Sequence, residues 1–255
     1  MCARLSDENP RDVEKSEGSV VSEDTQVSTA ENETSNPEYR HWRLQRDDQG
    51  IAWLTADNAD SSANVLSSIV LDELDAILAQ LETDKPKGLV VLSEKKNGFI
   101  VGADVKEFTT LKNESEAAAL IQRGQRVCNR LEAQTYPTVA LIHGFCLGGG
   151  MELALACRYR IADDDVKTKL GLPEVKLGIH PGFGGIGRLV PLTGAPVAMD
   201  MILTGRLLSA RASKKLGLID YAVPSRQLHH AAVATVLKSP PPTKAKGWKA
   251  WTNHA

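Results

Sequence analysis

Three successive glycines, Gly148–Gly150, stand between an apolar run typical of a buried strand, Thr138–Ile142, and an apolar helical run that ends near Cys157. Glycine weakens the interior of a strand or a helix, because it packs no side chain and loses the most backbone freedom on folding. The triplet therefore indicates a place where the backbone approaches another group closely. Free amides at the start of the following helix would face a developing negative charge there.

The same triplet is compatible with a purely structural role. On this stretch alone, a tight strand-to-helix turn without any ligand accounts for the glycines equally well. A dinucleotide-binding fingerprint does not fit, because the GxGxxG spacing that begins with Gly148 and Gly150 meets Leu153 where the third glycine belongs. The function of the triplet must therefore be judged from the residues around it.

The body of the chain alternates strand-like and helix-like patterns. Apolar residues from Leu71 to Leu81 recur at three- and four-residue steps, which is the periodicity of an amphipathic helix. Continuous apolar runs predict buried strands, and their alternation with helices favours an α/β fold with crossover connections. The other expected elements are a hairpin of Trp42–Gln45 and Ile51–Thr55 around Asp47–Gly50, strands at Gly88–Leu92 and Phe99–Gly102, and a helix at Ser115–Ala133.

The net charge of -2, from 30 basic and 32 acidic side chains, conceals two unlike ends. Residues 1–39 carry ten acidic and three basic side chains with few large apolar ones, so we expect a disordered acidic tail. Residues 238–255 carry four lysines, no acidic residue and the triplet Pro240–Pro242, which indicates a linker-like tail. Between them, residues 40–237 are expected to form one domain of nearly neutral charge.

Composition argues against several classes of protein. Balanced charge gives no electrostatic basis for a nucleic-acid or membrane-surface partner. No apolar run approaches the ~20 residues of a membrane span, and the acidic first segment has neither a signal-peptide core nor a transit-peptide charge. The cysteines show neither CxxC spacing nor a grouping with histidine, so we expect reduced thiols, no metal site and a cytoplasmic location. They are Cys2, Cys128, Cys146 and Cys157.

Two glutamates lie in glycine-rich surroundings. Glu152 closely follows the triple glycine, and Glu174 comes directly after a proline, among glycines and apolar residues. Glu174 is therefore unlike a residue of a solvated charged face, whereas a turn or helix-cap carboxylate stays an alternative to a catalytic one. Upstream, Asp104 is the expected N-cap of a helix, and its neighbour Ala103 would offer one more free backbone amide.

The remaining chemistry-bearing residues fit structural roles. His143 and His180 lie beside the glycine blocks, where a histidine more often packs or hydrogen-bonds than acts as a catalyst. No GxSxG motif accompanies them, so a serine triad is not expected. Asp163–Asp165 lacks the spacing of a calcium loop and predicts a solvated turn, and Arg188 predicts a structural cap or ion pair.

Together these blocks resemble the crotonase superfamily, the enoyl-CoA hydratases and isomerases, over residues 41–237. Any one glycine cluster is weak evidence, but several ordered blocks at family spacing form a specific pattern. More narrowly, Leu172–Gly178 and Pro181–Gly185 are similar to the hydratase half of the multifunctional fatty-acid oxidation enzymes, in which a 3-hydroxyacyl-CoA dehydrogenase follows. The other blocks are Ala63–Leu66, Gly102–Asp104, Gly148–Glu152, Gly178–Gly185 with Arg188–Leu189, and Leu203–Gly205 with Ala212 and Leu216–Asp220.

The resemblance implies an α/β fold with a core of repeated ββα turns, and hydration of 2-trans-enoyl-CoA to 3-hydroxyacyl-CoA in fatty-acid β-oxidation. It implies that the amides of Ala103 and Gly149 form an oxyanion hole for the thioester oxygen. Glu152 and Glu174 would be the two catalytic carboxylates. The CoA thioester is the substrate, so no cofactor is expected. Further substrate contacts are implied at Ala63, Val65, Gly102, Asp104, Gly148, Pro173 and Gly182.

The chain departs from the family pattern after Asp220. Family members usually continue with helices that complete the acyl pocket, whereas here only Gln227–Leu237 predicts a helix before the proline-rich tail. We therefore expect a truncated C-terminal helical part and no dehydrogenase half. Two alternatives stay open: a Δ3,Δ2-enoyl-CoA isomerase with one dominant carboxylate, and an inactive acyl-CoA-binding or oligomerising fragment. The expected partners are acyl-CoA, a second copy of the chain, or a component of a fatty-acid oxidation complex.

Overall fold

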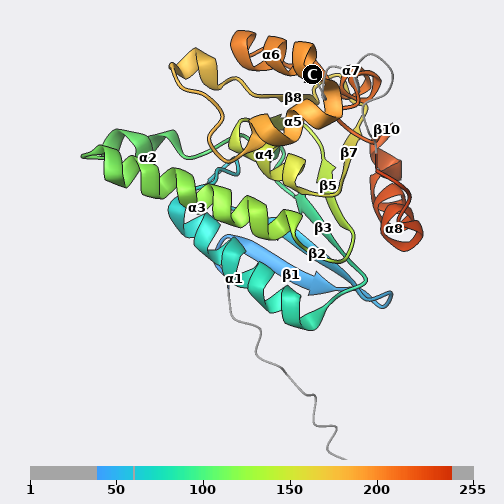
Figure 1. Cartoon of the computed structure of the whole chain (residues 1–255). Helices are drawn as coiled ribbons and strands as arrows, with labels where there is room; N and C mark the ends of the chain where they lie inside the picture. The colour runs from blue at the N-terminus through green and yellow to red at the C-terminus, as the bar shows by residue number, and fades with distance from the viewer. Residues whose placement is uncertain (1–38, 60, 243–255) are drawn as a thin grey trace, which may run out of the picture. The chain divides into compact units, whose positions relative to one another are not determined.

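A computed structural model describes residues 39–59 and 61–242 (Figure 1). A six-stranded sheet has the spatial order β1-β2-β3-β5-β7-β10. The first pair is the expected antiparallel hairpin, and every later neighbour pairs in parallel. The strands are β1 (Trp42–Arg46), β2 (Ile51–Ala56), β3 (Gly88–Ser93), β5 (Thr138–Ile142), β7 (Tyr159–Asp163) and β10 (Tyr221–Val223).

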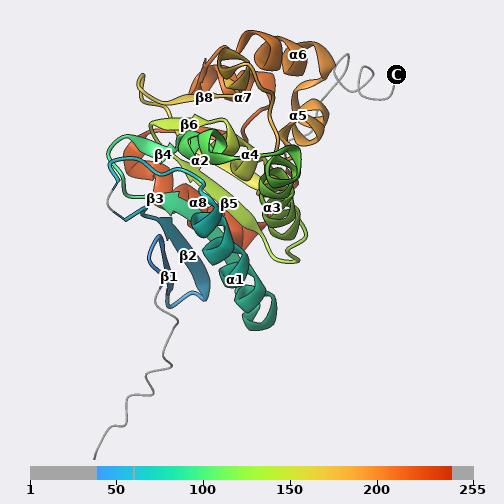
Figure 2. The same cartoon turned by 90° about the vertical axis from the view of Figure 1, so that its left-hand side faces the viewer.

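Helices cover both faces of this sheet. Leu89 and Val91 of β3 lie in the main core with α1 (Ser68–Asp84) and α3 (Glu114–Glu132). Val90 faces the other way and packs in a smaller cluster with α8 (Leu228–Lys238). Figures 1 and 2 show α1 and α3 on one face and α8 on the other. Burial on both faces explains why the parallel strands are continuous apolar runs.

The expected helices begin at polar caps. Ser67 accepts a hydrogen bond from the Val70 amide at the start of α1, and Asn113 accepts one from the Glu116 amide at the start of α3. Asp104 caps α2 (Val105–Thr110), as the sequence predicts. Each cap satisfies an amide that has no partner within its own helix.

A second, four-stranded sheet has the order β4-β6-β8-β9, with β4, β6 and β8 parallel. Each of these three strands directly follows a strand of the first sheet and precedes a helix, which confirms the expected repeated ββα pattern. Because the three are parallel neighbours, the turns after their carboxyl ends lie together. The strands are β4 (Gly98–Ile100), β6 (Phe145–Leu147), β8 (Lys169–Gly171) and β9 (Leu208–Ser209).

The remaining elements follow those turns and lead back to the first sheet. A buried ion pair of Arg160 in β7 and Asp220 just before β10, with an N–O distance of 3.2 Å, joins the end of this region to the sheet. No helix of residues 39–59 and 61–242 has the length and apolar character needed to cross a membrane. The elements are α4 (Gly149–Ala156), the 3-10 helix η1 (Glu174–Leu177), α5 (Gly185–Thr193), α6 (Ala195–Thr204), α7 (Ala210–Leu216) and the 3-10 helix η2 (Ser225–Gln227).

The structure corrects one sequence prediction and limits two others. Asp163 does not belong to a solvated turn: it is the buried last residue of β7, and its carboxylate accepts hydrogen bonds from Thr168 and Ser225. Of the two expected tails, residues 1–38 and 243–255 lie outside the described part of the chain. At their inner borders, Tyr39 packs against the core, and the Pro240 carbonyl accepts a hydrogen bond from the Tyr159 hydroxyl.

Candidate active site

The turns after β4, β6 and β8 surround a cavity of about 320 Å³. Both glutamates that the sequence singles out, Glu152 and Glu174, line it. Most of the remaining wall is apolar, which is typical of a small-molecule site with a few orienting polar groups. The apolar side chains are those of Val101, Val105, Phe108, Ile121, Leu177, Ile179 and Phe183.

The three glycines after β6 have different structural roles. Gly148 has a φ of 52°, a left-handed conformation that favours glycine, and its amide donates to the Gly171 carbonyl at 3.0 Å. A Cβ atom on Gly150 would lie 2.3 Å from the Ile100 carbonyl oxygen, so this glycine permits close packing of α4 on β4. A Cβ on Gly149 would lie 3.2 Å from the Ala103 nitrogen. Gly149 therefore keeps the space beside that amide open.

A short parallel bridge turns the Ala103 amide away from the neighbouring segment at Leu66. The Leu66 amide donates to the Gly102 carbonyl at 2.9 Å, and the Leu66 carbonyl accepts from the Asp104 amide at 3.2 Å. In such a bridge the residue between the two bonded ones, here Ala103, turns its own amide and carbonyl away from the partner strand. Gly149 is the first residue of α4, so its amide has no acceptor within the helix. Ala103 and Gly149 line the same cavity.

Glu152 lies on the first turn of α4 and is only 2% exposed. Its Oε1 atom accepts hydrogen bonds from the amides of Phe183 and Gly185, each at 2.8 Å, at the start of α5. Burial raises the pKa of this carboxyl, against the opposing effect of the two amides. Glu152 is thus held rigidly by one oxygen at the wall of the cavity.

Glu174 begins η1 and is 9% exposed. Neither of its carboxyl oxygens has a hydrogen-bond partner among the described residues. Burial is the main reason that the pKa of Glu174 rises to about 7, and the charge of Glu152 raises it further, while His180 acts in the opposite direction. Glu174 can therefore carry a proton near neutral pH and release it to a group in the cavity.

The structure brings some of the expected substrate-contact residues to the cavity and leaves others elsewhere. Gly102, Gly148, Pro173 and Gly182 line it together with Ala103 and Gly149. The remaining three, Ala63, Val65 and Asp104, are not among its lining residues. Asp104 instead accepts from the Lys106 amide at 3.0 Å, and the Val65 carbonyl accepts from the Asn58 side chain at 2.8 Å.

Phe183 is a wall residue that sequence reasoning did not single out. It is 3% exposed, and its ring fills the space beside Gly149. A Cβ on Gly124, in the middle of α3, would lie 2.3 Å from the Phe183 Cδ1 atom. An isolated glycine in the middle of a strongly amphipathic helix was the available signal, because such a glycine usually has a packing reason.

The residues given structural roles by the sequence have such contacts. His143 Nε2 bonds to the Lys95 carbonyl at 2.9 Å. Arg188 donates to Glu132 and Asn129 of α3, which ties α5 to that helix. His180 lines the cavity, with Nδ1 at 3.0 Å from the Pro181 carbonyl oxygen. Within residues 39–59 and 61–242, no group of three or more His, Cys, Asp or Glu side chains comes together to hold a metal ion.

Comparison with known proteins identifies the family. A sequence profile described as Enoyl-CoA hydratase/isomerase matches residues 46–254, which is most of the chain. The chain belongs to the enoyl-CoA hydratase/isomerase family. The family assignment agrees with the crotonase-type fold, and solved enoyl-CoA hydratases share that fold. The crystal structure of enoyl-CoA hydratase from Bacillus anthracis superposes with a TM-score of 0.71 and 32% identity, covering 78% of this chain and 76% of that one.

Within the enoyl-CoA hydratase/isomerase family, the chain is similar to subunits of larger proteins. The fatty acid oxidation complex subunit alpha of Aliivibrio fischeri is 45% identical over 207 residues, and that of Vibrio campbellii is 45% identical over 210 residues. These matches cover 80% and 82% of this chain, but the chain spans only 30% of the length of either relative. The structure of Pseudomonas aeruginosa DspI is also similar, with a TM-score of 0.73 and 27% identity over 82% of this chain and 79% of that one.

Proposed function

We propose that this protein hydrates 2-trans-enoyl-CoA thioesters to 3-hydroxyacyl-CoA. The observation that carries the proposal is the joint position of four groups around one apolar cavity. Glu152 and Glu174 are two carboxyls in different environments, and Ala103 and Gly149, whose amides would donate to the thioester oxygen, line the same space. The CoA thioester is the substrate, and the reaction needs no cofactor.

In the proposed mechanism, water adds to C3 of the enoyl group as the C2–C3 π bond breaks and a single bond remains. The electron pair moves onto the thioester oxygen, where the amides of Ala103 and Gly149 stabilise the enolate. Loss of one such donor typically costs about 2.7–4 kcal/mol of transition-state stabilisation. The C2–H bond then forms with the proton that Glu174 carries.

The two carboxyls divide the proton transfers between them. Glu152 anchors the attacking water and takes its proton, and Glu174 supplies the proton at C2. The hydrogen bonds from Phe183 and Gly185 favour the ionised form of Glu152, which suits a base, whereas the unpartnered oxygens of Glu174 favour a protonated acid. Over one catalytic cycle the two carboxyls together gain one proton from water and lose one to C2, so the net charge of the pair is unchanged.

Δ3,Δ2-enoyl-CoA isomerisation is the second candidate, and the state of Glu174 supports it. A carboxyl with two unpartnered oxygens and a pKa of about 7 can take a proton from one carbon and return it to another. The names of the relatives support a place in fatty-acid oxidation and a partner in such a complex. A second copy of the chain as a partner stays a prediction from the sequence. A cytoplasmic location stays a prediction from the sequence.

The test follows the absorbance of the enoyl thioester when the purified chain is mixed with crotonyl-CoA and with longer 2-trans-enoyl-CoA homologues. We expect loss of that absorbance and formation of 3-hydroxyacyl-CoA, detected by mass. Gain of absorbance from a 3-enoyl-CoA substrate, without hydration, would assign the site to isomerisation. Binding of acyl-CoA without turnover of either substrate would contradict both and favour the inactive fragment.

A further inference from the structure

The Asn64–Leu66 segment lies outside the lining of the cavity, yet it determines the direction of the Ala103 amide. The Asn64 carbonyl accepts from the Val101 amide at 2.9 Å, which is the first bond of the ladder continued by Leu66. Because the ladder bonds Gly102 and Asp104 on either side of Ala103, any shift of the segment rotates the Ala103 amide. The position of the proposed oxyanion donor thus depends on what holds Asn64.

The Asn64 side chain joins the ends of three strands. It is 2% exposed, and its Nδ2 atom lies 3.0 Å from the Ala56 carbonyl of β2, 2.9 Å from the Ser93 Oγ of β3 and 3.1 Å from the Phe99 carbonyl of β4. Its Oδ1 atom accepts from the Asn58 amide at 2.8 Å. Such a network, satisfied on both the donor and the acceptor side, permits one orientation of the side chain.

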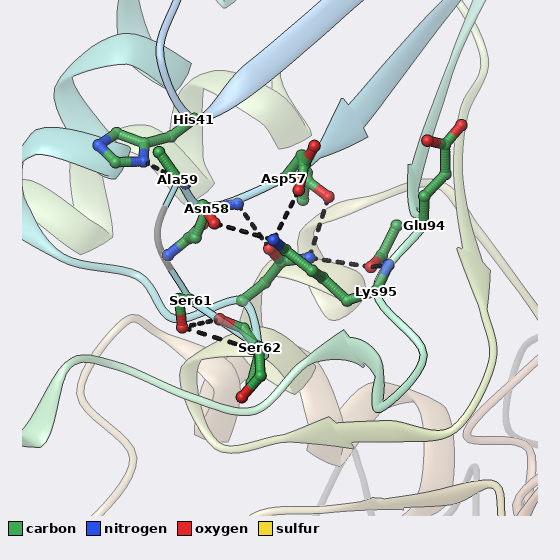
Figure 3. A network of polar contacts seen from close by, with 12 residues as sticks. His41, Asp57, Asn58, Ala59, Ser61, Ser62, Glu94 and Lys95 are labelled. Atoms are coloured by element: carbon green, nitrogen blue, oxygen red, sulfur yellow. Dashed lines mark hydrogen bonds and ion pairs between the residues drawn. The ribbon is translucent and has the colours of Figure 1, made fainter.

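A second polar network holds Asp57 and Asn58, just after β2 (Figure 3). Lys95 Nζ lies 2.7 Å from Asp57 Oδ1 and donates to the Asn58 carbonyl at 2.9 Å. Arg43 bridges Asp57 and Glu94. The contact with Lys95 is the largest of the causes that lower the pKa of Asp57, so this carboxylate stays ionised and paired near neutral pH. Asp57 and Asn58 are therefore held by Arg43 of β1 and by Lys95, just after β3.

The geometry points to Asn64 as a positioning residue for catalysis: its side chain fixes the strand ends that aim the Ala103 amide at the thioester oxygen. This inference rests on the proposed function. Asn64 itself lines no part of the cavity. A misplacement of about 1 Å caused by a residue away from the reacting atoms can cost roughly 100-fold in rate. The loss should appear in kcat, because the donor acts mainly on charge that develops in the transition state.

The experiment compares Asn64→Ala with the milder Ser93→Ala, which removes only one partner of the Asn64 side chain. Gln134→Ala is the matched control, because Gln134 is also a buried, hydrogen-bonded amide side chain but lies beyond the far end of α3. We expect kcat for crotonyl-CoA to fall by about 10- to 100-fold in Asn64→Ala and by less in Ser93→Ala, with KM little changed. Gln134→Ala should keep the wild-type kcat.

A second measurement, amide hydrogen exchange by mass spectrometry, does not depend on activity. The amides of Leu66, Val101 and Asp104 should exchange faster in Asn64→Ala, whereas amides of β5 should keep their wild-type rates. Wild-type kcat in a folded Asn64→Ala variant would overturn the inference. Unchanged exchange, or a loss of kcat equal to that of Gln134→Ala at the same loss of stability, would overturn it as well.

Failure of the proposed function gives a different pattern. A wild-type chain that does not hydrate crotonyl-CoA contradicts the hydratase proposal whatever the variants do. Exchange then still decides whether Asn64 holds the Ala103 segment. Faster exchange at Val101 and Asp104 supports that role, and unchanged exchange overturns it.

Discussion

Glu152 and Glu174 are the same residue type in different surroundings, and these surroundings suit them to different proton transfers in the proposed reaction. Two amides at the start of α5 hold one oxygen of Glu152, whereas neither buried oxygen of Glu174 has a hydrogen-bond partner among the described residues. Burial raises the pKa of both carboxyls, and the charge of Glu152 raises the pKa of Glu174 further. Near neutral pH the pair is therefore expected to hold one proton, mainly on Glu174.

We expect Glu174→Gln and Glu152→Gln each to lower hydration by at least about 100-fold, since each removes a positioned acid or base. Both variants should stay folded. Glutamine keeps an oxygen that can accept from Phe183 and Gly185, and at position 174 it removes a buried ionisable group. Steady-state kinetics with crotonyl-CoA and circular dichroism check the two parts. Near wild-type turnover in both variants would contradict the two-carboxylate mechanism.

The pH dependence follows from the same pair. The proposed hydration requires the form with one shared proton, so kcat/KM should fall as pH rises through the pKa of about 7 at Glu174. The contribution of Glu174 to stability should also fall as pH rises. A carboxyl with a raised pKa binds more protons in the folded than in the unfolded state. Its stabilising contribution is therefore present at low pH and is lost as pH rises through about 7. Thermal melts from pH 5 to 9 should show a smaller loss for Glu174→Gln than for wild type. An equal loss in both proteins would refute this assignment.

At the scale of elements, the site is a property of three parallel strand ends. β4, β6 and β8 each end in a turn that brings backbone or a carboxyl to the cavity, so no single helix or loop contains the site. The glycine triplet after β6 serves three needs in sequence order: a left-handed turn at Gly148, open space at Gly149 and helix packing at Gly150.

These different roles predict different losses from the same small substitution. Gly149→Ala should fold, because its Cβ would meet Phe183 and Ala103 atoms at 3.1–3.3 Å, contacts that shifts of a few tenths of an ångström relieve. It should weaken binding of an enolate-mimicking CoA thioester far more than binding of free CoA. Gly150→Ala should instead lower the melting temperature markedly, since its Cβ would lie 2.3 Å from the Ile100 carbonyl oxygen. Calorimetric titration and thermal melts check both. Equal loss of the two ligands in folded Gly149→Ala would assign that glycine to structure.

The long elements and one short strand, β4, could be predicted from the sequence, whereas β6 and β8 could not. Periodic apolar residues in α1 and α3 and continuous apolar runs in β3 and β5 determine those elements locally. β6 and β8 have three residues each and no period, so only their neighbours make them strands. The same distinction holds in the site. The two glutamates could be predicted from the glycine-rich residues next to them in the sequence. The position of Phe183 could not, because it depends on contact with Gly124, more than fifty residues away.

At the scale of the whole molecule, the Arg160–Asp220 pair joins the segment after the cavity to the first sheet. Both side chains are almost fully buried, at 3% and 4% exposure. The Arg160 amide donates to the Asp220 carboxylate at 2.8 Å, and the guanidinium also donates to the carbonyls of Cys157 and Leu218. The Arg160 guanidinium thereby caps the C-terminal end of α4 and also fixes the segment that leads into β10.

Asp220→Ala should lower the free energy of unfolding by about 3–5 kcal/mol, because it leaves a buried guanidinium without its carboxylate. Replacing both partners with apolar residues, as in Arg160→Met with Asp220→Leu, should recover part of that loss. Urea unfolding monitored by tryptophan fluorescence measures both variants. If the double variant is no more stable than Asp220→Ala, the loss comes from the carboxylate's backbone contact and not from the unpaired charge.

The parallel order of the sheet also governs how the chain reaches this fold. β10 pairs with β7 through Tyr221 and Ile161, sixty positions apart in the chain. Closing so long a loop is slow compared with forming the β1–β2 hairpin. During synthesis Arg160 leaves the ribosome well before Asp220, and until then the edge of β7 is open to pairing with other chains. The timing of β10 therefore determines how long the nascent protein is exposed to aggregation.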